Sequence, residues 1–455
     1  MTDRDIDIVI IGAGLTGLTL AYHLQKAGRN FIILEKKDKV GGVIQTHNED
    51  GFIFESGPNT GVIGNPEVAE LFEALPENCE LEIANPKAKN RWIWKKGKWN
   101  PLPSGPISAI STPLFTFRDK LRILGEPWRK KGNNPMESVA QLVERRLGKS
   151  FLKYAVDPFI SGVYAGDPAR LITKYALPKL YNLEQTYGSF IKGSMKKRKE
   201  PKTDRDKKAS REVFSAKGGL SNLIKALVKN IGSEHIILNT EQLKIQAKSQ
   251  GFEVKFSQKN GEPMIIKADK VVSTVGAYVI PEIFPFISKE QAESFTSLDY
   301  AKVVQVILGY SDWKSMPLNA FGGLVPGVEK RNILGILFTS SFFENRCPKN
   351  GVILSVFAGG MKRPDIIDMD DKKLVELILD EVNIMLQTNN HKPDLIRIFR
   401  YQKAIPQYGA TSPERLKSIG EIERTYPGLI LAGNIRDGIG MADRIKQATE
   451  IASLL

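Results

Sequence analysis

The sequence predicts an α/β protein in which a discontinuous nucleotide-binding domain is joined to a mixed-sheet domain and a helical insertion. Three observations predict this class. An apolar run at 7–11 enters a glycine-rich turn, a second apolar run at 429–432 enters another, and short alternating strands lie between them at 236–276. Strands that pass into a turn and an amphipathic helix are typical of a parallel, Rossmann-type sheet covered by helices. Because both ends of the chain contribute strands, we expect this domain to be built from separate segments.

The expected domain limits follow from where these patterns change. The nucleotide-binding domain is expected from residues 1–65, 211–276 and 421–455, the mixed-sheet substrate-binding domain from 66–100 and 277–420, and the helical part from 101–210. The helical part is also the expected membrane-associating part. With 455 residues, of which 42% are hydrophobic, the chain is long enough to bury several cores.

The first glycine turn has the G-x-G-x-x-G pattern, at Gly12, Gly14 and Gly17. Gly12 permits the sharp turn, Gly14 leaves no side chain between the backbone and a pyrophosphate, and Gly17 lets the helix pack closely on the strand. Free N–H groups at the helix N-terminus then face the phosphates. The turn is therefore predicted to hold the pyrophosphate of a dinucleotide.

An acidic residue, Glu35, follows the second apolar strand at 31–34. A carboxylate at this distance from the turn is placed to accept hydrogen bonds from a ribose hydroxyl, and it would repel the 2′-phosphate of NADP. These residues leave NAD and FAD open. The pair Gly41 and Gly42, with the later Gly57, gives the backbone further places of close approach to a cofactor. Such a second glycine motif is not needed by NAD enzymes, so it favours FAD.

The C-terminal glycine turn follows the apolar run at 429–432. Gly433 and Asn434 form the turn, and Gly438, Gly440 and Met441 open the final helix. A helix N-terminus here would place positive partial charge against the edge of the cofactor that becomes anionic on reduction. We therefore expect these five residues to bind the same cofactor as the first turn.

The formal net charge is +14, and much of it lies in residues 192–211, which we name the basic segment. Its basic residues are Lys192, Lys196, Lys197, Arg198, Lys199, Lys202, Arg205, Lys207, Lys208 and Arg211. A solvated, mobile loop is the favoured interpretation of such a charge block, and contact with anionic lipid is the functional alternative. Nucleic-acid binding is not expected, because no aromatic residues are interleaved with the charges.

The cysteines and histidines indicate which cellular compartment to expect for the protein. Cys79 and Cys347 lie far apart without a metal-ligand neighbour, and the four histidines are scattered singly, so we expect no disulfide and no metal. The polar start of the chain and the lack of a run of about 18 apolar residues give no sign of a signal peptide or a membrane span. We expect a cytoplasmic protein, peripheral on the inner face of the cell membrane if the basic segment binds lipid.

The middle of the chain is predicted from its periodicity and its glycines. A helix beginning near 66 precedes a hairpin that turns at 95–98, and residues 117–190 are mostly helical, with amphipathic patterns at 139–147 and 151–160. Residues 161–168, which contain two glycines and a proline, are predicted to be a loop.

Several segments together resemble the FAD-dependent protoporphyrinogen and coproporphyrinogen oxidase family of the flavin amine oxidase superfamily. The resemblance covers nearly the whole chain, and its most specific segments are residues 159–168, 178–189, 214–220 and 404–408. It implies FAD, and the absence of a cysteine near the C-terminal glycine turn favours a non-covalent link. The chain departs from the family pattern at Val43, where an arginine commonly follows the glycine pair.

The resemblance implies an oxidase of haem biosynthesis that converts protoporphyrinogen IX to protoporphyrin IX. Six electrons leave the substrate in three flavin cycles, each ended by O2 with release of H2O2, and the first step is hydride transfer from a meso carbon to the flavin. The family shows no histidine or acid acting as a base. Catalysis would then depend on placement of the macrocycle and on electrostatics.

Three residues match positions around the substrate in that family. Gly162, the catalytic-site residue that we expect, lies in a segment whose backbone runs close to the substrate above the flavin. Arg91 matches an arginine that pairs with a propionate, and Phe321 resembles an aromatic wall residue. The expected partners are a porphyrinogen and O2. A homodimer is compatible with the resemblance, although the sequence does not set the oligomeric state.

Three alternatives remain open. Coproporphyrinogen III, with four propionates instead of two, would be oxidised by the same chemistry. An amine oxidase is less favoured, because no aromatic residue lies between Gly433 and Met441 to help cage an amine. A flavin-free binding module of the same fold would have lost the cofactor glycines, which this chain retains.

Overall fold

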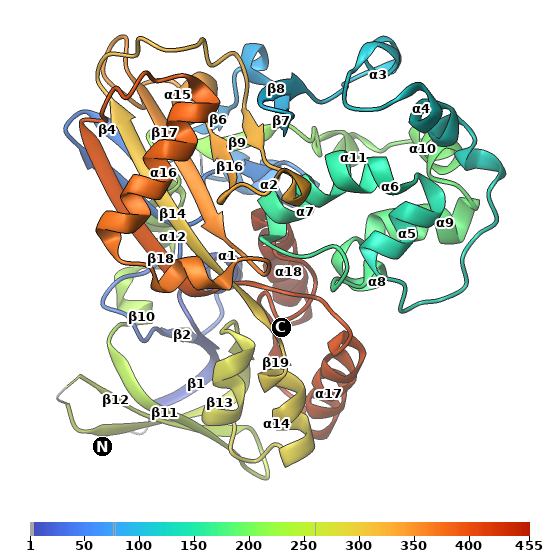
Figure 1. Ribbon diagram of the computed structural model, residues 1–455. Helices are drawn as coiled ribbons and strands as arrows, with labels where there is room; N and C mark the ends of the chain where they lie inside the picture. The colour runs from blue at the N-terminus through green and yellow to red at the C-terminus, as the bar shows by residue number, and fades with distance from the viewer. Residues whose placement is uncertain (1–3, 76, 78, 260) are drawn as a thin grey trace.

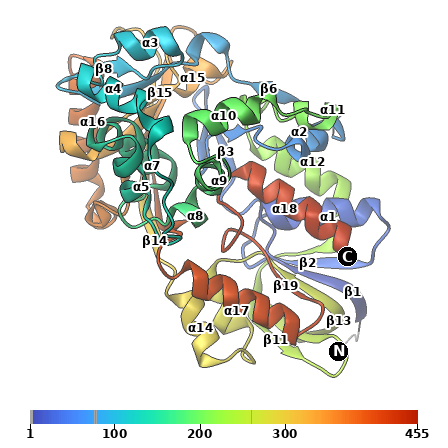
Figure 2. The ribbon, with the colours of Figure 1, turned by 90° about the vertical axis from the view of Figure 1, so that its right-hand side faces the viewer.

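The computed structural model describes residues 4–75, 77, 79–259 and 261–455. These residues form two seven-stranded sheets, one above the other in Figure 1, with a group of helices beside the upper sheet. The lower sheet carries helices on both faces (Figure 2). This arrangement confirms the predicted fold class, including the discontinuous origin of the nucleotide-binding sheet.

The lower sheet is mainly parallel and ends in the glycine turns. Its strands, in order across the sheet, are β10 (Ile236–Ile237), β2 (Phe31–Leu34), β1 (Arg4–Ile11), β13 (Pro263–Ser273), β12 (Phe252–Gln258) and β11 (Thr240–Ala247), with β19 (Leu429–Leu431) paired to β13. β1 is parallel to both β2 and β13, and β19 is parallel to β13. Parallel strands end at the same edge of a sheet, so the turns after β1, β13 and β19 lie close together.

Helices cover both faces of this sheet because successive residues of β1 point to opposite sides. Ile8 and Ile10 join one core, and Val9 and Ile11 join the other. On the first face lie α1 (Leu15–Lys26), α2 (Pro66–Glu73), α12 (Ser221–Ile231) and α18 (Met441–Leu454). On the second face lie α13 (Ile280–Ile283), α14 (Lys289–Thr296) and α17 (Ser412–Thr425).

The upper sheet is mixed, because β15 and β7 are parallel and its other pairs are antiparallel. In order it contains β18 (Leu395–Pro406), β14 (Tyr300–Tyr310), β17 (Val352–Gly359), β16 (Ile333–Leu337), β15 (Gly322–Leu324), β7 (Arg91–Lys95) and β8 (Lys98–Pro101). The predicted hairpin is the β7–β8 pair. Against this sheet pack α16 (Asp371–Leu386) and the short helices α15 (Thr339–Phe342) and η7 (Pro364–Asp368).

Smaller elements complete the two sheets. They are the hairpin of β3 (Gln45–Glu49) and β4 (Phe52–Ser56), the small sheet of β5 (Gly61–Val62), β9 (Val213–Ala216) and β6 (Leu81–Ile83), and the single turns η1 (Pro86–Ala88), η4 (Ser233–His235), η5 (Ala277–Val279) and η6 (Gly327–Glu329).

The helical part lies beside the upper sheet (Figure 1). It contains α3 (Pro106–Ser111), α4 (Phe117–Leu124), η2 (Glu126–Trp128), α5 (Val139–Arg146), α6 (Lys149–Phe151), the π-helical η3 (Leu152–Val156), α7 (Asp157–Tyr164), α8 (Thr173–Ala176), α9 (Pro178–Tyr187), α10 (Phe190–Lys199) and α11 (Asp204–Lys207). Within the described residues, none of the helices is both long and apolar enough to cross a bilayer.

The predicted loop at 161–168 is wrong in its first half. Gly162 lies inside α7, which ends only after Tyr164, where Ala165 takes a left-handed conformation with φ 47°. A glycine inside a helix costs about 1 kcal/mol relative to alanine. Here it is required, because a Cβ at residue 162 would lie 2.4 Å from Cδ2 of Leu324. Close packing on β15 therefore decides the local structure.

The basic segment is not the solvated loop that its composition favours. Its first part belongs to α10, and Arg205 in α11 pairs with Glu67 at 2.9 Å and Glu70 at 2.8 Å on α2. Lys208 pairs with Glu73 at 2.5 Å. Acidic residues of α2 thus neutralise Arg205 and Lys208, Asp204 pairs with Lys207, and five basic residues of the segment lie on α10.

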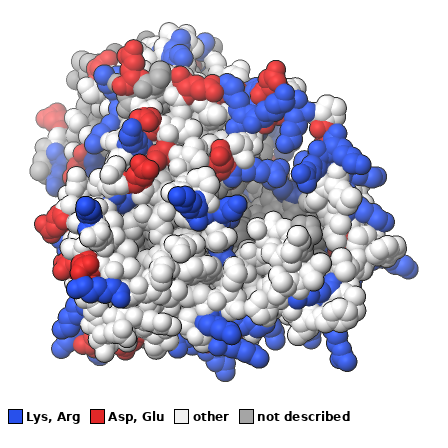
Figure 3. Space-filling view, turned by 90° about the horizontal axis from the view of Figure 1, so that it is seen from above, with Lys and Arg blue, Asp and Glu red and all other residues white. Residues whose placement is uncertain are grey.

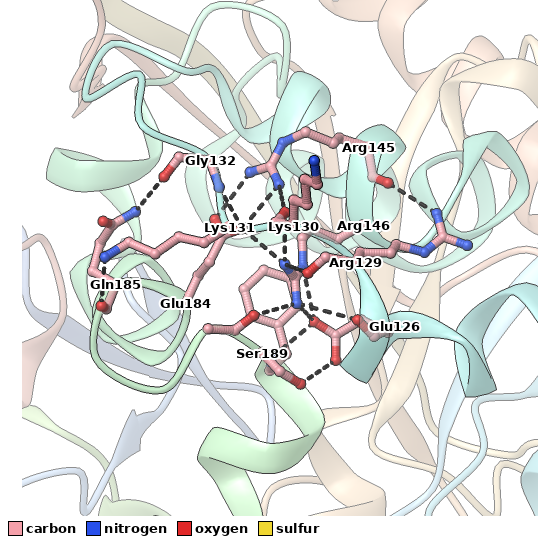
Figure 4. A network of polar contacts seen from close by, with 12 residues as sticks. Glu126, Arg129, Lys130, Lys131, Gly132, Arg145, Arg146, Glu184, Gln185 and Ser189 are labelled. Atoms are coloured by element: carbon pink, nitrogen blue, oxygen red, sulfur yellow. Dashed lines mark hydrogen bonds and ion pairs between the residues drawn. The ribbon is translucent and has the colours of Figure 1, made fainter.

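A buried ion-pair network joins the helices of this part (Figure 4). The carboxylate of Glu126 accepts hydrogen bonds from Nε of Arg146 at 2.8 Å, from Oγ of Ser189 at 2.6 Å and from the N–H of Phe190 at 2.9 Å. Arg146 also pairs with Glu184 at 3.0 Å, and all three charged side chains are at most 1% exposed. The network holds η2, α5, α9 and the first turn of α10 together.

The pKa of Glu126 is lowered by this environment. Burial alone would raise the pKa, but the hydrogen bonds from Ser189, Phe190 and Arg146 outweigh that effect. A carboxyl group whose pKa falls on folding stabilises the fold above its unfolded pKa of about 4.3 and loses that contribution as the pH falls through the folded value. The network is therefore fully formed at neutral pH.

Replacing Glu126 with Gln should lower the free energy of unfolding by roughly 3–5 kcal/mol, the usual cost of removing one partner of a buried ion pair. Urea unfolding of the purified protein measures the change. Glu144→Gln is the matched control, because Glu144 pairs with Lys149 at 3.4 Å on the exposed surface, where the expected change is below about 1 kcal/mol. Equal effects of the two substitutions would contradict a structural role for the network.

Candidate active site

The first glycine turn has the geometry that its sequence predicts. Gly12 has φ +100°, which favours glycine. A Cβ on Gly17 would lie 2.0 Å from the carbonyl oxygen of Gly12, so α1 packs directly on the turn. A Cβ on Gly14 would meet nothing within 4 Å, which leaves open space beside its backbone.

The second glycine pair lies against the first turn. The N–H of Gly41 donates to the carbonyl of Ala13 at 2.8 Å, and a Cβ on Gly42 would lie 3.3 Å from Cα of Gly14. Gly57 supports this segment, because a Cβ there would lie 2.2 Å from the carbonyl oxygen of Val43. Residues 12–17 and 41–43 therefore form one backbone surface.

Glu35 follows directly after β2 and is buried. Its Oε2 accepts a hydrogen bond from the N–H of Ala13 at 2.7 Å, and its Oε1 accepts one from the N–H of Lys37 at 2.9 Å. The carboxylate thus fixes the first turn. Each oxygen retains a lone pair that can accept a further hydrogen bond from a hydroxyl group.

The C-terminal glycine turn reaches the same edge of the sheet. A Cβ on Gly433 would lie 2.8 Å from the carbonyl oxygen of Thr274, and the N–H of Thr274 donates to the carbonyl of Ile11 at 2.9 Å. Thr274 thereby joins the ends of β1, β13 and β19. The turns predicted from the two ends of the sequence are neighbours in space.

The turn then leads into α18. Gly438 has φ +98°, and the N–H of Gly440 donates to Oδ2 of Asp443 at 3.1 Å, which caps the helix. The side chain of Met441 is buried in the core, so only its backbone can face a bound group. The helix N-terminus that the sequence predicts is present at this position.

Three buried side chains that the sequence interpretation missed hold the C-terminal loop, residues 432–440. The hydroxyl of Tyr408 lies 2.8 Å from the carbonyl oxygen of Asn434 and 3.0 Å from that of Gly438. Arg415 donates to the carbonyl of Ile435 at 3.0 Å, and Arg444 donates to the next two carbonyls at 3.0 and 2.9 Å. Burial raises the pKa of Tyr408, so its phenol stays protonated and donates.

The sequence offered a weak signal for one of these three. Tyr408 lies in one of the segments that carry the family resemblance, although no role follows from that. Arg415 and Arg444 lie on helices where an arginine is usually exposed. Only the packing of those helices against the loop shows that both are buried.

Arg91 and Phe321 lie together at the edge of the upper sheet. The guanidinium of Arg91 lies 5.3 Å from the ring centroid of Phe321, and that ring stacks on Phe342 at 4.2 Å. Among the residues that the structure describes, Arg91 has no carboxylate within ion-pair distance. The pair therefore presents a cation and an aromatic surface side by side.

Helix α7 connects this edge with the C-terminal loop. Gly162 packs on Leu324, which pairs with Ile93 across the β15 and β7 strands. Two residues later, Tyr164 shares a core with Tyr408 and Ile439 of the loop. Burial and the charge of Asp443 raise the pKa of Tyr164 to about 12. Gly162 thus lies between the cation of Arg91 and the C-terminal loop, without direct contact with either.

The backbone surfaces at the carboxyl edge suit a dinucleotide. Three glycine segments meet there without side chains between them, Gly14 faces open space, and a helix N-terminus adds positive partial charge. The residues present therefore fit the group that the sequence predicts.

Comparison with known proteins gives the family. The model of the flavin containing amine oxidoreductases matches residues 15–450. A chloroplastic protoporphyrinogen oxidase of Nicotiana tabacum is 30% identical over 99% of this chain and 85% of its own. A coproporphyrinogen III oxidase of Bacillus subtilis is 24% identical over 100% of this chain and 98% of its own.

Solved structures agree on the fold. A protein from Exiguobacterium sp. 255-15 superposes with a TM-score of 0.81 at 23% identity, covering 100% of this chain and 99% of that one. Taken with the glycine turns at one sheet edge, these matches show that the chain belongs to the flavin containing amine oxidoreductases, in the FAD-dependent protoporphyrinogen and coproporphyrinogen oxidase family, and that its cofactor is FAD.

Proposed function

We propose that the protein oxidises protoporphyrinogen IX to protoporphyrin IX in haem biosynthesis, with O2 as the acceptor and H2O2 as the second product. The observation that carries the proposal is Arg91, a cation without a carboxylate partner among the described residues, over the ring of Phe321. A porphyrinogen is an apolar macrocycle that bears propionates, so its site needs an apolar wall and a cation. The names of the relatives support the same substrate class.

Each substrate residue has one role in this proposal. Arg91 pairs with a propionate, which fixes one end of the macrocycle. Phe321 forms part of the apolar wall, and the backbone of α7 at Gly162 borders the space between the wall and the C-terminal loop. Bound FAD supplies the two-electron oxidation. Because no side chain is assigned as a base, the protein contributes placement and electrostatics.

The cofactor roles follow from the backbone surfaces. Gly12 and Gly14 border the pyrophosphate, Gly17 lets α1 pack on the turn, and Glu35 accepts a hydrogen bond from the ribose. The remaining cofactor positions are Gly41, Gly42 and Gly57, which build the second surface, and Gly433, Asn434, Gly438, Gly440 and Met441, whose backbone forms the C-terminal loop and the start of α18. We assign FAD binding to residues 1–65, 211–276 and 421–455, and substrate binding to 66–100 and 277–420.

Coproporphyrinogen III is the second candidate substrate. The relative from Bacillus subtilis carries that activity in its name and matches nearly its whole length. The chemistry at the macrocycle is the same, and the two substrates differ in the number of propionates that the site must neutralise.

Porphyrin fluorescence measured over time, with the purified protein in air, tests the substrate. We expect protoporphyrinogen IX to be oxidised faster than coproporphyrinogen III, with one H2O2 formed for each O2 consumed. Blanks without protein correct for spontaneous oxidation. Faster turnover of coproporphyrinogen III would assign the second candidate, and rates equal to the blank for both would refute a porphyrinogen substrate.

Replacing Arg91 with Ala should raise the KM for the porphyrinogen by about tenfold to a hundredfold, because a charge-assisted contact with a propionate is lost. The FAD content, read from the flavin absorbance, should not change. Lys89→Ala removes an exposed cation two residues away and is the control. An unchanged KM in Arg91→Ala would remove Arg91 from the substrate site.

We further propose that the protein contacts an anionic membrane through α3, α4 and η2. Six large apolar side chains here are exposed to solvent and form what we name the apolar ridge: Ile107, Ile110, Phe117, Leu121, Leu124 and Trp128. Between the two helices, Leu114 and Phe115 are buried in the core, so the segment that carries the ridge is packed firmly onto the protein. Patches of this kind are typical of surfaces that bind a partner or a membrane.

Helix α4 is turned outward. Its polar side chains bond to the protein: Asp119 caps the helix through Thr116, Lys120 donates to the carbonyl of Thr112 at 2.9 Å, and Arg122 donates to that of Glu144 at 3.0 Å. Its apolar face is left to the solvent. An exposed apolar face on a helix whose polar face is held inward indicates a partner of low polarity.

The charge around the ridge favours anionic lipid. The ammonium of Lys192 lies 6.0 Å from the ring of Trp128, and α10 continues with Lys196, Lys197, Arg198 and Lys199. In Figure 3, Lys and Arg predominate over the right-hand part of the face seen from above, where α3, α4 and α10 lie. A second copy of this surface would be repelled, whereas each basic residue near an anionic bilayer contributes about 1 kcal/mol.

Sedimentation with liposomes tests the contact. The protein should bind vesicles that contain anionic lipid at least tenfold more tightly than neutral vesicles, and Phe117→Ser with Trp128→Ser should abolish most of that binding. Ile384→Ser, which changes an exposed apolar residue on α16, is the control. Equal binding of neutral and anionic vesicles would refute the contact.

A further inference from the structure

Arg415 is a buried cation for which the described part of the chain provides no carboxylate. Its side chain is 1% exposed. Nε donates to the carbonyl of Ile435 at 3.0 Å and Nη2 donates to Oγ of Ser412 at 3.3 Å, while Nη1 is buried without a hydrogen-bond partner. Burying a charge without a counter-charge is costly, so such a group needs an explanation.

The surroundings of Arg415 do not neutralise it. Its guanidinium lies 5.6 Å from the ring centroid of Tyr408, and burial lowers its pKa, an effect that only the phenols of Tyr408 and Tyr300 oppose. Both phenols are uncharged at neutral pH, because burial raises their pKa values. An arginine keeps its proton under these conditions. The positive charge therefore persists next to the C-terminal loop.

The C-terminal loop directs its main-chain carbonyls toward three buried side chains. The carbonyls of five consecutive residues, 434–438, accept hydrogen bonds from Tyr408, Arg415 and Arg444. In a planar trans peptide the N–H of the next residue points opposite to the carbonyl. Each N–H that follows one of these carbonyls therefore points away from the donor that the carbonyl contacts. The N–H of Arg436 donates within the loop to the carbonyl of Gly433 at 3.5 Å, and the other N–H groups of the loop lie beside a persistent positive charge.

A structural role alone does not account for this arrangement. A neutral donor such as the hydroxyl of Tyr408 is sufficient to hold a carbonyl, and it avoids the cost of a buried charge. By contrast, the buried Arg146 has carboxylate partners in Glu126 and Glu184. The partner that is missing for Arg415 is therefore expected from outside the chain.

We propose that the counter-charge of Arg415 is the negative charge of bound FAD. Arg415 is a positioning residue: it orients the C-terminal loop through Ile435 and adds a positive potential that favours anionic forms of the cofactor. Tyr408 and Arg444 orient the same loop. This inference rests on FAD as the cofactor and is independent of which porphyrinogen is oxidised.

The test compares Arg415→Lys, which keeps the charge, with Arg415→Gln, which keeps a donor for Ile435 but removes the charge. Two quantities are measured on the flavin-loaded protein without any porphyrinogen: the dissociation constant of FAD, from flavin released on dilution, and the midpoint potential of the bound flavin. We expect Arg415→Gln to raise the dissociation constant at least tenfold and to make the potential more negative, because stabilisation of the negative charge is lost. Arg415→Lys should stay within about threefold of the unsubstituted protein.

Similar behaviour of the Lys and Gln variants in both quantities would overturn the proposal, since the charge would then be irrelevant. If Arg415→Gln does not fold, Arg415→Met replaces it in the same comparison with Arg415→Lys. Failure of the porphyrinogen assay would leave these measurements unaffected, so the two proposals fail separately. A matched control is Arg400→Gln, because Arg400 also donates to main-chain carbonyls, at 3.0 and 2.7 Å, but lies in the upper sheet and is paired with Asp371.

Discussion

The structure depends on the close approach of backbone to backbone at the carboxyl edge of the lower sheet. A side chain on Gly17 would collide with the carbonyl of Gly12, one on Gly433 would collide with Thr274, and one on Gly57 would collide with Val43. Segments from the two ends of the chain can therefore meet here only as glycines. Because these residues have no side chains, a cofactor can also reach the backbone N–H groups. Packing and cofactor binding therefore both require glycine at these positions.

Helix α7 connects the C-terminal loop with the upper sheet. Its Gly162 lies against Leu324, and its Tyr164 lies against Tyr408 beside the C-terminal loop. The carbonyl oxygen of Ala165 then accepts a hydrogen bond from the N–H of Met361 at 2.8 Å, which ties the helix end to the segment that follows β17 in the upper sheet. A rigid helix between the two sheets fixes the distance between Arg91 and the loop. Placement of a substrate against a cofactor needs such a fixed distance.

The sequence predicted the features that local patterns determine. The glycine turns and the β7–β8 hairpin followed from residue types that few other local structures require. The missed features depend on contacts between distant residues. Gly162 lies in a helix because Leu324 packs on it, α10 is ordered because Glu126 holds its first turn, and Arg415 is buried because α17 packs on the loop. Composition and periodicity do not reveal contacts between distant residues. At these positions tertiary packing outweighs local propensity, so the sequence alone did not predict the structure.

Four arginines fall into two groups, according to whether a carboxylate of the chain pairs with them. Arg146 and Arg346 are buried and find carboxylates within the chain, so they hold helices and strands together. Arg91 and Arg415 find none among the described residues; Arg91 is exposed beside Phe321, and Arg415 is buried beside the C-terminal loop. For the buried Arg415, no anion of the described chain offsets the cost of desolvation, and an anionic ligand would do so. Under the proposals made for the two sites, FAD and the propionates of the substrate would supply the negative charge that Arg415 and Arg91 lack within the described chain.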